Sequence, residues 1–234
     1  MLDVTERRRP GQQVVLFDLD GTLSNSEPGI CSTLKVAITE VGLAVPSDEV
    51  LRTTIGPPFA TGLPAIGVPE HLVERVTVAY RAIYDDTGLF DTCMYDGVAE
   101  MLDELGEHGC TLCVATSKPD TSARRVIEHL GLSDRFKVIG AAGDDYVRHT
   151  KAEVIADVLD QLGFVASDEL IMVGDRRFDV EGATAHGIDT IGAGWGYGSA
   201  GELQEAGAWA IAYQPADVVA MITRRAGALW SSRA

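Results

Sequence analysis

The chain has 234 residues, of which 46% are hydrophobic and 23% are charged, so it can bury one substantial core and a smaller second one. Its 35 acidic and 19 basic side chains give a formal net charge of −16, which disfavours nucleic acid polymers and anionic membranes as partners. No stretch is apolar enough to span a bilayer, no signal-peptide pattern precedes the first apolar run, and the four cysteines show no disulfide framework. We therefore expect a cytoplasmic protein without membrane contact.

The first predicted strand is the apolar run Val14–Phe17, and two carboxylates follow it at once. An unbroken apolar run is typical of a strand that is buried on both faces of a parallel sheet. Asp18 and Asp20 come next, and Gly21 follows them. Two like charges one residue apart fit either a turn or a reactive site at the end of the strand.

Residues 25–93 carry helical periodicity and no convincing strand. Apolar residues three and four positions apart predict one helix through Ile30 and Val41 and another through Leu72 and Ile83, with a short helix at 47–56 between them. We expect an all-helical cap at 25–93, inserted into a core that comprises residues 1–24 and 94–234.

From residue 96 onward, short apolar runs alternate with helical stretches. The helices predicted at 96–109 and 150–163 each have one apolar face and end on a glycine. Strands that alternate with helices of this length predict an α/β fold with a doubly wound, Rossmann-like parallel sheet. The later predicted strands are Thr111–Ala115, Lys137–Gly140, Glu169–Val173, Asp189–Ile191 and Trp209–Ala212.

Polar side chains follow three of the predicted strands, and reactive groups in open α/β sheets lie outside the carboxyl ends of the strands. Lys151, in the first turn of its helix, is a cation in a place that the helix macrodipole disfavours. Carboxylates clustered at one edge repel each other unless a cation lies among them, so we expect a Mg²⁺ site there. The residues that follow the strands are Asp18 and Asp20, then Thr116, Ser117 and Lys118, then Asp175 and Asp179.

Four segments resemble, in the right order, the four motifs of the haloacid dehalogenase superfamily of phosphohydrolases. They are DLDGTL at 18–23, ATS at 115–117, Lys151, and GDRRFD at 174–179. The helical insert resembles the cap of the subfamily that contains phosphoglycolate phosphatases, β-phosphoglucomutases and 5'-nucleotidase-like enzymes. IGPPF at 55–59 and GAGWGYGS at 192–199 are similar to the phosphoglycolate phosphatase and 5'-nucleotidase branch.

The resemblance implies a Mg²⁺-dependent phosphatase that hydrolyses a small phosphorylated metabolite through an aspartyl-phosphate. We expect the protein to be a monomer or homodimer. It implies that Asp18 is the nucleophile, that Asp20 is the general acid and base, and that Thr116 and Lys151 stabilise the transferring group. The implied metal ligands are Asp18, the main-chain carbonyl of Asp20, Asp175 and Asp179. The residues expected on the substrate side are Gly21, Thr22, Ser117, Lys118, Arg176, Pro57 and Phe59.

Several assignments stay open at the level of sequence. Arg176 fits a partner of the acidic cluster, a substrate ligand or a surface charge, and Phe59 fits a base-stacking residue or part of the cap core. His149 lies close to Lys151 in sequence without an assigned role. Asn25 stands at the hinge into the cap, where many relatives carry an aspartate.

Two other functions use similar residues. A phosphomutase would return the phosphoryl group to a sugar instead of to water. A receiver-like signalling domain would keep a long-lived aspartyl-phosphate, but it would need neither the second carboxylate, Asp20, nor a helical insert that excludes water. Hydrolysis of phosphate esters is the function that these features favour.

Overall fold

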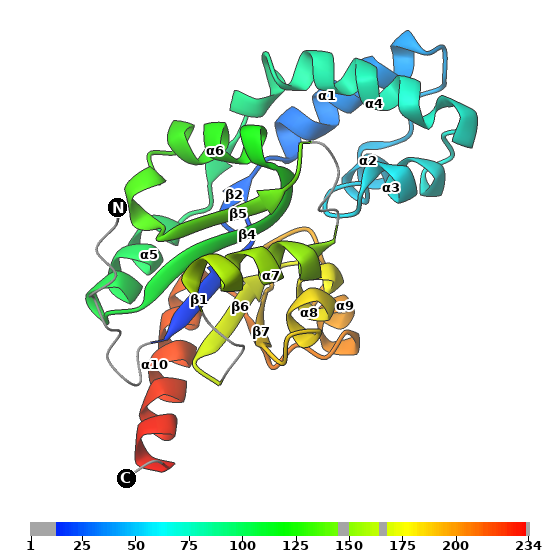
Figure 1. Cartoon of the computed structure of the whole chain (residues 1–234). Coiled ribbons are helices and arrows are strands. Elements are labelled where there is room, and N and C mark those ends of the chain that lie inside the picture. The colour runs from blue at the N-terminus through cyan, green and yellow to red at the C-terminus, as the bar shows by residue number, and fades with distance from the viewer. Residues whose placement is uncertain (1–12, 145–149, 164–167, 233–234) are drawn as a thin grey trace.

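Six parallel strands form one sheet in a computed structural model that describes residues 13–144, 150–163 and 168–232 (Figure 1). His149 lies outside these ranges. The strand order is β5-β4-β1-β6-β7-β8, and every pairing is parallel. The predicted doubly wound α/β fold is thereby confirmed. The strands are β1 (Val14–Phe17), β4 (Thr111–Pro119), β5 (Val138–Ala142), β6 (Leu170–Gly174), β7 (Asp189–Ala193) and β8 (Ala210–Ala212).

Helices cover both faces of the sheet, and the alternation of side chains along β1 feeds both cores. Val15 and Phe17 pack in one cluster with α5 (Val98–Glu107), α6 (Asp120–His129) and α10 (Pro215–Ser232). Val14 and Leu16 pack in the other with α7 (Lys151–Leu162) and α8 (Arg177–Thr184). The shorter elements of the core are η2 (Ser133–Arg135) and α9 (Ala200–Glu205).

The central strand β1 brings three sequence motifs to one edge of the sheet. Its last residue, Phe17, pairs with Val114 of β4 on one side and with Val173 of β6 on the other. The chain runs outward from β1 in both directions, so the carboxyl ends of these three strands meet at the topological switch point. The residues that follow the three strands therefore lie next to one another.

The cap is helical, as the sequence predicts, with one helix that the periodicity does not reveal. The helices predicted around Ile30, at 47–56 and around Val76 form α1 (Glu27–Glu40), α2 (Asp48–Arg52) and α4 (Glu70–Tyr84). Between them, α3 (Phe59–Ala65) begins directly after Pro58, and η1 (Gly88–Phe90) follows α4.

The expectation that residues 25–93 contain no strand is wrong at both ends. β2 (Ser24–Asn25) and β3 (Cys93–Met94) pair antiparallel where the chain enters and leaves the cap. Two-residue strands are too short to carry an alternating pattern, which explains why the sequence does not reveal them.

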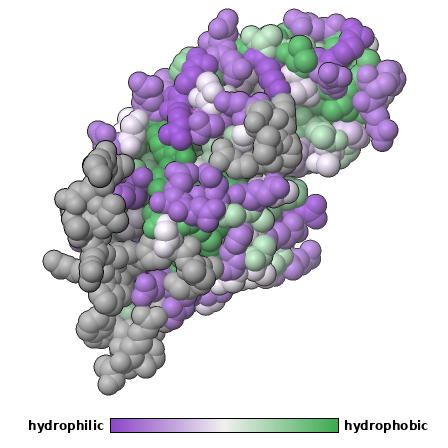
Figure 2. Space-filling model, viewed as in Figure 1, coloured by the Kyte–Doolittle hydropathy of each residue, from purple (hydrophilic) through white to green (hydrophobic). Residues whose placement is uncertain are grey.

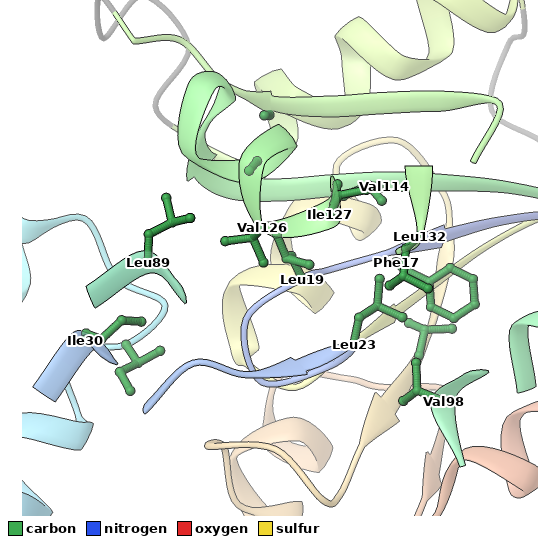
Figure 3. Close-up of a cluster of buried hydrophobic side chains, with 14 of the residues drawn as sticks. Phe17, Leu19, Leu23, Ile30, Leu89, Val98, Val114, Val126, Ile127 and Leu132 are labelled. Carbon is green, nitrogen blue, oxygen red and sulfur yellow. The ribbon is translucent and has the colours of Figure 1, made fainter. Parts of the chain in front are cut away.

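The cap and the core share one continuous apolar interior. Figure 3 shows buried side chains that extend from Val98 and Leu132 in the core, past Leu19, to Ile30 and Leu89 at the base of the cap. On the face seen in Figure 2, polar and charged residues spread over both parts, and apolar residues form smaller areas between them. Among the described residues, no helix combines the length and apolarity needed to cross a bilayer.

Candidate active site

Lys151 joins two carboxylates at the carboxyl edge of the sheet. Its Nζ lies 2.8 Å from Asp18 Oδ1 and 2.8 Å from Asp179 Oδ1, and it donates to the Ala115 carbonyl at 2.9 Å. The ammonium group therefore lies between two carboxylates and one main-chain carbonyl. At an effective dielectric of about 20, attraction to two carboxylates amounts to several kcal/mol, which exceeds the roughly 0.3–1 kcal/mol by which the α7 macrodipole opposes the cation.

The acidic residues outnumber the cations in this buried cluster. Ligand oxygens of Asp18, Asp175 and Asp179 lie within 4.8 Å of one another, and the three residues are 7%, 0% and 1% exposed. Lys151 neutralises one of the three charges, so two remain. Burial raises the pKa of Asp18 to about 6, with Asp179 adding to the rise and Lys151 opposing it. Burial and the charges of Asp179 and Asp18 also raise the pKa of Asp175 well above its ordinary value.

This charge imbalance fits a divalent cation with oxygen ligands. Asp179 Oδ1 is buried and, although close to the Lys151 ammonium, makes no hydrogen bond of normal geometry. Carboxylate oxygens are the ligands that Mg²⁺ takes in phosphoryl-transfer sites. The donor set of Asp18, Asp175 and Asp179 therefore suits Mg²⁺. The Asp20 side chain is turned elsewhere, toward Lys118.

A glycine-rich segment holds Asp175 in place. The Tyr197 N–H donates to Asp175 Oδ2 at 2.7 Å. A Cβ atom at Gly196 would lie 2.3 Å from the Asp175 Cβ, and one at Gly198 would lie 2.0 Å from the Asp175 carbonyl oxygen. Gly21, with φ of 89°, is equally close, since its Cβ would meet Asp175 Oδ2 at 2.3 Å. Only glycine permits this approach of main chain to carboxylate.

A second ion pair links the core to the cap. Lys118 Nζ lies 2.9 Å from Asp20 Oδ2 and donates to the Tyr84 hydroxyl at 2.7 Å. Lys118 belongs to β4, which continues beyond the predicted end at Ala115 with a register shift between Thr116 and Pro119. Such an irregularity turns side chains away from the regular alternation. The Thr116 hydroxyl accepts the Lys118 N–H at 3.2 Å and is buried beside the cluster.

Two residues expected on the substrate side, Arg176 and Phe59, contact other protein groups, and their part in substrate binding stays a prediction. Arg176 is bonded to Glu202 Oε1 at 2.9 Å and to the Ile55 carbonyl of the cap. Phe59 packs edge-on against Tyr80, with ring centroids 4.7 Å apart, and therefore fills the cap core.

Of the remaining substrate-side residues, Gly21 and Thr22 lie close to Asp175 of the acidic cluster. For Ser117 and Pro57 the described part of the chain shows no hydrogen bond to that cluster. The Thr22 hydroxyl lies 3.4 Å from Asp175 Oδ1, at the limit of a hydrogen bond. Ser117 is half-buried in β4, and Pro57 is half-buried in the cap.

Three residues of this region were not singled out from the sequence. Tyr84 and Glu202 bind Lys118 and Arg176, and Tyr197 binds Asp175. The density of glycines around Tyr197 is a signal that could have pointed to it, because glycines mark close approach of the main chain to another group.

Comparisons with known proteins agree with this arrangement. The family model for haloacid dehalogenase-like hydrolases matches residues 15–193. The tyrosine-protein kinase PtkA of Mycobacterium tuberculosis (strain ATCC 25618 / H37Rv) is 44% identical over 193 residues, which are 82% of this chain and 66% of that protein. The chain thus spans just under two thirds of the kinase. A 5'-nucleotidase of Pseudomonas aeruginosa is 37% identical over 191 residues, covering 81% of this chain and 86% of that enzyme.

The solved structures include a close match in fold. A predicted phosphatase from Clostridium acetobutylicum superimposes with a TM-score of 0.86 at 33% sequence identity. The match covers 91% of this chain and 99% of the other. Sheet, cap and connections therefore correspond over nearly the whole length.

Proposed function

The chain belongs to the haloacid dehalogenase-like hydrolase family, and we propose that it is a magnesium-dependent phosphatase of small phosphate monoesters. The observation that carries this proposal is the contact of Lys151 with both Asp18 and Asp179, beside Asp175, in a buried cluster with excess negative charge. Such a cluster suits a dianionic phosphoryl group only when cations offset it.

Asp18 is the proposed nucleophile. Among the described residues, both bonds to its carboxylate go to Oδ1, from Lys151 Nζ and from the Leu19 N–H at 2.7 Å. This leaves Oδ2 as the oxygen that attacks phosphorus. A bond forms between Oδ2 and phosphorus while the bond to the leaving oxygen breaks, which gives an aspartyl-phosphate.

Asp20 is the proposed acid and base. It gives a proton to the leaving oxygen in the first step and then takes one from the water that attacks phosphorus, so that the Asp18 carboxylate and inorganic phosphate are released. Leu19, fully buried between the two aspartates, anchors the turn that carries Asp20. Thr116 would donate its hydroxyl to the phosphoryl oxygens.

Asp18, Asp175 and Asp179, with the main-chain carbonyl of Asp20, would hold Mg²⁺. When bound, the ion neutralises charge on the phosphoryl oxygens. Main-chain N–H groups orient two of these carboxylates. The Tyr197 N–H donates to Asp175, and the Arg176 N–H donates to Asp179 Oδ2 at 3.0 Å.

The proposed substrates are phosphoglycolate or a nucleoside 5'-monophosphate. The 37% identity to a 5'-nucleotidase and the segments IGPPF and GAGWGYGS support this class.

A substrate panel tests the proposal. Phosphoglycolate, nucleoside monophosphates and hexose phosphates are each incubated with and without Mg²⁺, and both inorganic phosphate and isomerised sugar phosphate are measured. We expect phosphate release that needs Mg²⁺ and is lost in Asp18→Asn. Isomer without free phosphate would indicate a mutase, and a stable phosphoprotein without turnover would indicate a signalling domain.

A second candidate is phosphoryl transfer to a tyrosine hydroxyl, which the 44% identity to PtkA favours. The same nucleophile would take the phosphoryl group from a nucleoside triphosphate and pass it to a phenol instead of to water. Incubation with labelled ATP and a tyrosine-containing peptide, in parallel with the ester panel, separates the two activities.

A further inference from the structure

Tyr197 binds two separate parts of the molecule with two different groups. Its N–H donates to Asp175 Oδ2 at 2.7 Å, in the acidic cluster. Its hydroxyl accepts the N–H groups of Ser26 at 2.8 Å and of Glu27 at 3.0 Å, at the beginning of the first cap helix. Tyr197 thus connects Asp175, a proposed metal ligand, to the segment where the chain enters the cap.

The start of α1 depends on this hydroxyl. The first N–H groups of a helix have no partner within the helix and are usually satisfied by the side chain of the N-cap residue. The N-cap here, Ser26, makes no such bond, and its hydroxyl is instead 3.1 Å from the Ser24 hydroxyl and 3.0 Å from that of Thr92. The Tyr197 hydroxyl instead accepts the N–H groups of Ser26 itself and of Glu27, the first residue of the helix.

Asn25 completes the junction. Its Oδ1 accepts the proton of the Tyr197 hydroxyl at 3.2 Å and the Glu27 N–H at 3.3 Å. The hydroxyl thus contacts three groups of the hinge, and the Tyr95 hydroxyl is a further hydrogen-bond partner of it. The amide oxygen of Asn25 accepts these bonds without adding a charge near the acidic cluster.

We propose that Tyr197 is a positioning residue that couples the hinge of the cap to the metal ligand Asp175. A shift of the Asn25–Glu27 segment moves the Tyr197 ring, and the ring moves the main chain that holds Asp175. The close packing of Gly196 and Gly198 on Asp175 leaves no space for this motion to be absorbed. The inference rests on the proposed function only in taking Asp175 as a Mg²⁺ ligand.

Tyr197→Phe tests the coupling, because it keeps the ring and the main chain and removes only the hydroxyl. Loss of the shared acceptor should speed hydrogen exchange of the Ser26 and Glu27 amides about five- to tenfold without Mg²⁺, and weaken Mg²⁺ binding by about the same factor. Exchange is followed by NMR or mass spectrometry, and Mg²⁺ affinity by calorimetry, so neither readout needs turnover. Tyr213→Phe, at a side chain that is 68% exposed, is the matched control and should match the unmodified protein.

Two variants of Asn25 extend the test. Asn25→Asp keeps an acceptor for the hydroxyl and should retain normal exchange at Ser26 and Glu27, whereas Asn25→Ala should speed it. Unchanged Mg²⁺ affinity in Tyr197→Phe, with or without faster exchange, would overturn the coupling. If the protein releases no phosphate from any ester but Tyr197→Phe alters both readouts, the coupling stands and the proposed function fails. If phosphate is released and neither readout moves, the coupling alone fails.

Discussion

Lys118 Nζ and Asp20 Oδ2 are 2.9 Å apart, and Lys118 is only 8% exposed. Burial disfavours a charged lysine, but Asp20 and Tyr84 outweigh that effect and raise the Lys118 pKa. The lysine is therefore an ammonium group that fixes the proposed acid and base between strand β4 and cap helix α4. Orientation of Asp20 thus depends on the position of the cap.

Removal of the Lys118 charge should impair catalysis more than removal of the Tyr84 hydroxyl. Lys118→Met leaves Asp20 without its partner, and we expect kcat to fall about 10²-fold, the low end of what a positioned acid and base contributes. Tyr84→Phe keeps the ion pair and should lower kcat by less than about tenfold. Steady-state kinetics on the best ester of the panel compare the two. Equal losses would show that Asp20 does not depend on the lysine.

Asp20→Asn should discriminate between leaving groups. An alkyl phosphate needs a proton on its leaving oxygen, so kcat should fall about 10²- to 10⁴-fold. The loss should be smaller for p-nitrophenyl phosphate, whose leaving group departs without a proton, because there only the second step still needs a base. The two esters are assayed side by side at one pH. A loss of equal size for both would remove the acid role from Asp20.

Mg²⁺ should stabilise the protein more at pH 7.5 than at pH 5. Without metal, burial raises the pKa of Asp18 from 3.8 to about 6, so its contribution to stability is present below pH 3.8 and is lost as pH rises through about 6. Above that pH Asp18 is ionised beside the other two carboxylates, and Mg²⁺ no longer competes with a proton for its oxygens. Thermal unfolding with and without 10 mM Mg²⁺, about the level used in such assays, measures the difference. A shift in Tm of the same size at both pH values would contradict the prediction.

Gly198→Ala should disturb the proposed metal site by steric overlap with Asp175, without any backbone strain at position 198. Gly198 has no positive φ, but an added Cβ would lie 2.0 Å from the Asp175 carbonyl oxygen, so Asp175 must move. We expect weaker Mg²⁺ binding and at least about tenfold lower kcat, since displacement of a catalytic group by about 1 Å can cost 10²-fold. Gly106→Ala is the control, because its Cβ meets nothing within 4 Å in helix α5. That variant should bind Mg²⁺ normally and gain about 0.5–1 kcal/mol of stability.

The sequence predicts the parts of the site that follow from strand order. Asp18, Thr116 and Asp175 each lie at or just beyond the end of an apolar run, and the switch-point rule then places them together. The contact of Lys151 with Asp18 agrees with the resemblance to the family. The six strands of the sheet were all predicted, most of them to within two residues.

Features that depend on distant packing could not be obtained in this way. Tyr84 is the last residue of α4 and reaches Lys118 because that end of the cap helix lies beside β4, and no local pattern encodes that approach. Helix α3 begins after Pro58, where the missing N–H of proline is harmless, although Gly-Pro-Pro resembles a plain helix stop. The role of Phe59 then follows from α3, since the helix directs its ring onto Tyr80.

The shared apolar interior shown in Figure 3 also constrains how this protein denatures. Leu19, Ile30 and Leu89 belong to one buried cluster that includes residues of both parts, so unfolding of the cap alone would expose apolar surface of the core to water. Calorimetry should accordingly record a single heat-absorption peak, with calorimetric and van't Hoff enthalpies in agreement. Truncation to the core alone, with a short linker in place of 25–93, would yield an aggregation-prone fragment instead of a smaller enzyme.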